Sequence, residues 1–151
     1  MKTTFAIVGL VGFLVSAAVH LFTLLGTDAS YYFPWIWVLH GGIFMALWPI
    51  AGKTVQPNVQ WPLPRWSTLL LAGFLVYGLI SFMLFLRSTG TPDIWNGKYV
   101  LHSHGQLIRE LSEGDYRLER ARMFRGFSGL WMMFYLFTTL DFWYSKKFAT
   151  G

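Results

Sequence analysis

Four long apolar runs are the feature that most constrains how this chain can fold. Each run contains at most one charged residue and comes close to the length of about 20 residues that an α-helix needs to cross a bilayer. Charged residues make up only 13% of the chain, against roughly 25% in soluble domains, so ionic groups are too few to cover a globule in water. We therefore predict four transmembrane helices, at residues 5–25, 33–51, 66–86 and 127–144.

The charge balance favours lipid over nucleic acid as the partner of the basic residues. The formal net charge is +5, and it is accompanied by 8 Trp, 7 Tyr and 14 Phe, mostly near the ends of the apolar runs. Membrane interfaces select this combination of basic and aromatic residues. The chain has no cysteine, which excludes a disulfide framework and thiolate metal ligands.

The segment 87–125 has a soluble-like composition, with 7 of the 12 basic and 5 of the 7 acidic residues. Within it, Lys98 to Leu111 predicts a β-hairpin with a three-residue turn at Ser103-His104-Gly105. The resulting cross-strand pairs suit their neighbours: Leu101 with Leu107, Val100 with Ile108, and Lys98 with Glu110. A two-residue turn would instead place His102 against Leu107 and Val100 against Arg109, which pairs less well.

A long helix is predicted directly after this hairpin. Ser112 is a good N-cap, and Glu113 and Asp115 lie in the first turn, where the helix dipole favours acids. No strong breaker follows, so one helix of about 50 Å should run from Glu113 to about Lys147 and project beyond the bilayer. The predicted fold is one all-α membrane domain, residues 1–151. It is a four-helix bundle whose extramembrane part, 88–126, contains the hairpin and the projecting helix.

Two histidines in the first two predicted spans are candidates for cofactor binding. His20 and His40 lie on antiparallel helices joined by a short turn, so both should sit about 8–10 Å below the same membrane face. Equal depth suits the two axial ligands of a b-type haem, a metal ion or a direct hydrogen bond. The favoured alternative is structural, because His20 belongs to a stripe of small and polar residues that suits helix packing: Gly9, Gly12, Ser16, His20 and Thr23.

Two further patterns have a functional and a structural interpretation. His102 and His104 alternate on a predicted strand, a spacing that can chelate Zn²⁺ or Cu²⁺, but no third ligand has clear spacing and turn polarity explains both equally. Met123, Met132 and Met133 lie among aromatic residues and suggest either a quinone or lipid groove or ordinary packing.

The sequence leaves two classes of function open. Nucleotide-binding glycine motifs and the zinc-protease and serine-hydrolase motifs are absent, so an enzyme is not favoured. The first class is a non-catalytic accessory or scaffold subunit, or an assembly factor, whose hairpin and projecting helix dock other membrane protein subunits. The alternative is a membrane redox or ligand-binding protein that uses His20 and His40, with one b-type haem.

The expected orientation places both termini in the cytoplasm. Cations are more numerous on the hairpin side, which by itself would favour that side as cytoplasmic. The first helix usually dominates, however, and Lys2 precedes it while the following loop 26–30 carries no cation. We expect an integral protein of the cytoplasmic membrane if the source is bacterial.

Overall fold

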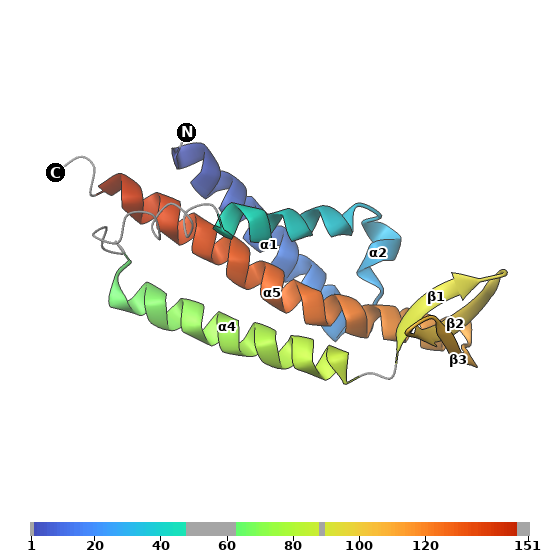
Figure 1. The fold of residues 1–151 in the computed structure, drawn as a ribbon. Coiled ribbons are helices and arrows are strands. Elements are labelled where there is room, and N and C mark those ends of the chain that lie inside the picture. Colours follow the sequence, from blue (N-terminus) through green and yellow to red (C-terminus); the bar gives the residue numbers. More distant parts are fainter. Residues whose placement is uncertain (1, 48–62, 88–89, 148–151) are drawn as a thin grey trace.

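Three long helices and a small sheet make up most of the protein. The computed structural model describes residues 2–47, 63–87 and 90–147. Helix α5 (Glu113–Lys147) is the spine, and both α1 (Lys2–Leu24) and α4 (Arg65–Leu86) pack along it, as Figure 1 shows. A short helix α2 (Ala29–Tyr32) follows α1, and the 3₁₀ helix η1 (Ile36–His40) continues as helix to Leu47. The sheet lies at the end of the bundle where α5 begins (Figure 1).

Two of the described helices are long and apolar enough to cross a membrane. They are Thr3–Leu24 and Arg65–Leu86, which correspond to the first and third predicted spans. The apolar helix Ile36–Leu47 is shorter, and the predicted span 33–51 extends into residues outside the described part of the chain. The fourth predicted span lies within α5, where polar side chains interrupt the apolar run. A bundle of four spans therefore stays a prediction.

Helix α5 begins and continues as predicted. The Ser112 hydroxyl oxygen accepts the backbone N–H of Asp115 at 3.1 Å and donates to the Asp115 carboxylate at 2.8 Å. The helix then runs unbroken from Glu113 to Lys147. Its glycines allow a close approach to α4 rather than a kink: a Cβ on Gly126 would lie 2.7 Å from Phe85 Cβ.

The predicted small-residue stripe on α1 faces α5. A Cβ on Gly9 would lie 2.6 Å from the Thr139 hydroxyl, and a Cβ on Gly12 would lie 2.4 Å from the Tyr135 ring. Both distances are shorter than van der Waals contact, so only glycine lets the two helices approach this closely. The other members of the stripe, Ser16, His20 and Thr23, are all buried.

The sheet has three antiparallel strands in the order β1-β2-β3, one more than predicted. They are β1 (Thr91–Trp95), β2 (Lys98–Ser103) and β3 (Gln106–Glu110). The additional strand β1 is joined to β2 by Asn96-Gly97, with φ values of 51° and 76°. Positive φ at both central residues is the geometry for which Asn-Gly is preferred in hairpins, so the sequence carried a signal for this turn.

The predicted register of β2 and β3 is wrong. The turn has two central residues, His104 and Gly105, with φ values of 51° and 79°. His102 therefore pairs with Leu107, and after an irregularity Leu101 pairs with Arg109 and Val100 with Glu110. A turn with two positive φ values matches the twist of the strands, and the one-residue bulge absorbs the resulting mismatch. The predicted ion pair between Lys98 and Glu110 still forms, at 2.6 Å.

The sheet is fixed to the first turns of α5. The backbone N–H of Leu111 donates to the Tyr99 carbonyl at 2.8 Å, and the rings of Tyr99 and Tyr116 lie 4.7 Å apart. Val100 and Leu101, in the middle strand, are almost fully buried. The sheet and the beginning of α5 therefore form one unit.

Candidate functional site

His20 joins all three long helices. Its Nδ1 lies 2.8 Å from the Ser128 hydroxyl on α5, and its Nε2 lies 2.6 Å from the Tyr77 hydroxyl on α4. The side chain is buried, with 4% of its surface exposed. Hydrogen-bonded polar side chains hold membrane helices together, and this one connects helices that are far apart in the sequence.

The hydrogen-bond chain through His20 can form with its donors pointing in either of two directions. A neutral imidazole has one donor and one acceptor nitrogen. In the first arrangement Tyr77 donates to His20, His20 donates to Ser128, and Ser128 donates to the Arg125 carbonyl at 3.3 Å. In the second, Ser128 donates to His20 and His20 donates to Tyr77, so the Tyr77 hydroxyl proton is free to point outward. Tyr77 can thus offer either an acceptor or a donor to a third group.

Arg125 caps the C-terminal end of α1 beside these hydrogen bonds. One terminal nitrogen of its guanidinium donates to the carbonyl oxygen of Thr23, and the Thr23 hydroxyl donates to the His20 carbonyl at 2.6 Å. A cation next to the last carbonyls of a helix is favoured by the helix dipole. Arg125 therefore stabilises the C-terminal end of α1 in contact with α5.

His40 lies in an aromatic cluster rather than in the His20 chain. Its ring centroid is 5.1 Å from Trp37, 5.2 Å from Phe127 and 5.0 Å from Trp131. Within the described part of the chain, His20 and His40 share no hydrogen-bond or ring partner, although Phe127 and Ser128 are neighbours on α5. Both nitrogens of His20 are engaged, so ligation of a haem iron would require the loss of a bond to Ser128 or Tyr77. The haem site stays a prediction.

The two sheet histidines lie in different surroundings. The His102 ring stands edge-on to Trp95 with centroids 5.2 Å apart, while His104 occupies the exposed turn. Within the described ranges, no group of three or more His, Asp or Glu side chains is arranged to hold a metal ion. The predicted metal site at His102 and His104 remains a pair without a third ligand among these residues.

An ion pair that sequence reasoning missed connects the α1–α2 turn to α5. Arg120 Nε lies 3.4 Å from the Asp28 carboxylate, and an Arg120 terminal nitrogen donates to the Ser30 hydroxyl at 2.6 Å. Asp28 also caps α2 by accepting the backbone N–H of Ser30 at 3.0 Å. Arg120 and Arg125 are partly buried and hold α2 and α1 against α5. No local pattern indicates a pair this distant in the sequence.

Met123 and Met132 are buried, which agrees with the packing interpretation.

Comparisons of the chain with protein-family models, with curated proteins and with solved structures found no match. The residues of the chain itself are therefore what bears on its function.

Proposed function

We propose that the chain is an integral membrane protein whose helices cross the bilayer four times and hold the sheet at one membrane face. The distribution of exposed apolar side chains supports this proposal. On α4, Leu69 is 73% exposed and Leu84 is 63% exposed, whereas polar Ser128 and Thr138 on α5 are fully buried. An apolar exterior around a polar seam is favourable in lipid and unfavourable in water.

The number of spans can be tested with single cysteines, because the chain has none of its own. Thr4→Cys, Asn58→Cys and Thr150→Cys should react with an impermeant maleimide from the cytoplasmic side. Thr27→Cys and Ser103→Cys should react only from the opposite side. Labelling of positions 27 and 58 from the same side would contradict four spans.

Within the membrane, the proposed role is that of a non-catalytic accessory or scaffold subunit, or an assembly factor, that docks another membrane protein on its sheet. One observation carries this proposal: the sheet is joined rigidly to α5, yet it exposes large apolar side chains outside the long helices. Ile94 and Trp95 on β1 are both more than half exposed, and Leu107 and Ile108 on β3 are nearly so. Exposed apolar groups that are not covered by lipid mark interaction surfaces.

A photo-crosslinking amino acid at Trp95 or Ile108 tests the docking role in native membranes. A matched control at Val76, which is exposed on α4, should crosslink to lipid only. We expect one discrete protein adduct from the two sheet positions, and its loss when Ile94→Glu is added to the Trp95 variant. Lipid adducts at all three positions would contradict docking of a protein.

A single b-type haem held by His20 and His40 is the second candidate. Its support is that both histidines pack on the same turn of α5, His20 on Ser128 and His40 on Phe127. An absorption spectrum of the purified protein tests it. A Soret band that disappears in both His20→Ala and His40→Ala would favour haem, and its absence from protein purified after haem supplementation would contradict it.

A further inference from the structure

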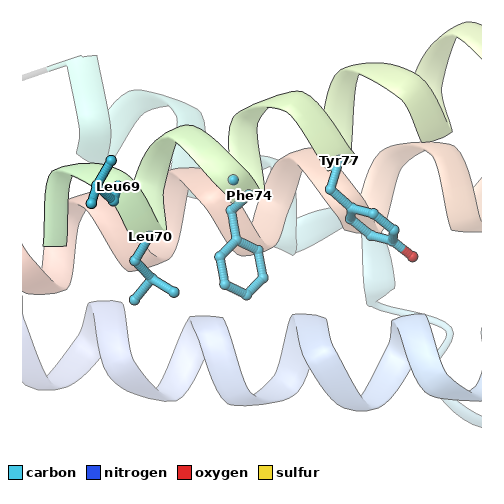
Figure 2. Close-up of a pocket in the computed structure, with 5 residues that line it drawn as sticks. Leu69, Leu70, Phe74 and Tyr77 are labelled. Atoms are coloured by element: carbon cyan, nitrogen blue, oxygen red, sulfur yellow. The ribbon is translucent and has the colours of Figure 1, made fainter. Parts of the chain in front are cut away.

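A shallow, open groove of about 350 Å³ runs along α4, and all of its lining residues belong to that helix. Its lining is apolar apart from one hydroxyl group and consists of Leu69, Leu70, Gly73, Phe74 and Tyr77. In Figure 2, Leu70 and Phe74 point from α4 toward α1. The Phe74 ring also meets Phe13 of α1, with centroids 5.6 Å apart.

Gly73 leaves the middle of the groove open. A Cβ placed on Gly73 would meet no other atom within 4 Å, so close helix packing does not require a glycine here. Gly78, five residues further along α4, differs in this respect, because its Cβ would lie 2.9 Å from the Gly129 carbonyl oxygen. Gly73 therefore widens the groove without contributing to the contact between α4 and α5.

The polar group among the lining side chains is the Tyr77 hydroxyl, whose position is fixed by its hydrogen bond to His20. Because the hydrogen bonds through His20 can run in either direction, Tyr77 can donate to a carbonyl oxygen or accept from a hydroxyl group. The rings of Phe74 and Tyr77 stand one helical turn apart and offer two aromatic surfaces to a planar group.

The depth of Tyr77 limits which molecules can use this site. It lies 12 residues after Arg65 and 9 before Leu86, the ends of α4, which places it about 14–18 Å from either end of the helix. When α4 spans the bilayer, this level is deep in the hydrocarbon core. A phospholipid presents only acyl chains at this depth, whereas a lipid-soluble molecule with an oxygen on its ring can bring that oxygen there.

We propose that this groove binds an isoprenoid-type quinone or its quinol. The planar ring lies against Phe74 and Tyr77, one ring oxygen exchanges a hydrogen bond with the Tyr77 hydroxyl, and the apolar tail follows Leu69 and Leu70. The two directions of the His20 chain match the two oxidation states, since a quinone needs a donor and a quinol needs an acceptor. The site requires α4 to span the bilayer but does not depend on the docking role of the sheet.

The test uses the full chain in phosphatidylcholine nanodiscs, titrated with decylubiquinone, and follows quenching of tryptophan fluorescence. The wild-type protein should show saturable quenching. Gly73→Leu fills the groove and should weaken binding at least about tenfold. Gly41→Leu is the matched control, because a Cβ at Gly41 also meets nothing within 4 Å but lies on a different helix, and its binding should equal that of the wild type.

A second variant keeps the groove and removes only the hydroxyl group. Tyr77→Phe should weaken decylubiquinone binding by about tenfold, the effect of one lost hydrogen bond. Quenching that rises linearly and equally in all variants would overturn the proposal, since it would report partition into the bilayer only. A phospholipid that co-purifies with the wild type, is lost in Gly73→Leu and is not displaced by decylubiquinone would also overturn it, in favour of a lipid groove.

Discussion

His20 on α1 and Tyr77 on α4 are joined by a hydrogen bond of 2.6 Å between the imidazole Nε2 and the phenol oxygen. Both helices pack mainly on α5, and this bond, with the Phe13–Phe74 ring contact, links α1 and α4 directly. The other nitrogen of the same imidazole bonds Ser128 of α5. One side chain therefore bonds to both of the other long helices.

Removal of this imidazole should destabilise the bundle. His20→Ala leaves the buried Ser128 hydroxyl without its partner on α1, and the expected loss is about 1–3 kcal/mol of unfolding free energy. His104→Asn is the control, because His104 is exposed and Asn tolerates its positive φ. Unfolding of both variants in mixed detergent micelles measures the difference, and equal stability would mean that the His20 chain contributes nothing.

The α1–α5 seam should tolerate no larger residue at Gly12. A side chain there would overlap the Tyr135 ring, whereas the space around Gly41 is open, so Gly12→Leu should lower the apparent melting temperature in detergent more than Gly41→Leu. Gly26 would be unsuitable as the control because its φ of 75° strains any other residue. Equal melting temperatures would show that the seam can separate.

Local signals predicted the elements that depend on neighbouring residues. The cap at Ser112 and the absence of breakers predicted α5, and the spacing of Gly9 and Gly12 predicted a packing face on α1 but not that α5 is the helix it meets. The register of the sheet was predicted wrongly because cross-strand pairing was weighed above turn geometry. His104 and Gly105 both adopt positive φ, and a bulge on β3 then corrects the pairing.

The sequence indicated His20 as a residue of the candidate site but did not indicate the residues that it bonds. Its depth in the span and its place in the small-residue stripe marked His20. Its partners lie 57 and 108 residues away, and no pattern within one helix indicates Tyr77 or Ser128. Equal depth suggested His40 instead. Depth does not determine which way a side chain turns around its helix axis, and the His40 ring contacts Trp37 and Trp131.

The hairpin turns should depend on glycine. Gly97 and Gly105 have φ values of 76° and 79°, so Gly97→Ala and Gly105→Ala should each cost about 1 kcal/mol in the stability of the sheet. Faster hydrogen exchange at the Val100 and Leu101 amides would report this loss. Gly114→Ala, in the first turn of α5 and clear of close contacts, should leave that exchange unchanged. Unaltered protection in both turn variants would contradict the role assigned to the turns.

Arg120 should contribute more to stability than Arg122, although the two lie on the same helix two residues apart. Arg120 bonds Asp28 and Ser30 and lies over the Phe124 ring, with its side chain 21% exposed. Arg122 pairs only with Glu119 among the described residues, at 2.9 Å, and is 52% exposed. Hydrogen bonds to charged groups in partly buried positions contribute about 1.5–3 kcal/mol, whereas exposed ion pairs contribute about 0–1 kcal/mol.

Arg120→Met should therefore destabilise the protein by about 1.5–3 kcal/mol, and Arg122→Met by less than about 1 kcal/mol. The effect of Arg120→Met should be largest at the turn between α1 and α2, because Asp28 loses its ionic partner there while it still caps α2. Hydrogen exchange at the Ser30 and Tyr31 amides, compared between the two variants in the same detergent, locates the change. If the two variants exchange alike at these amides, Arg120 does not hold the α1–α2 turn against α5.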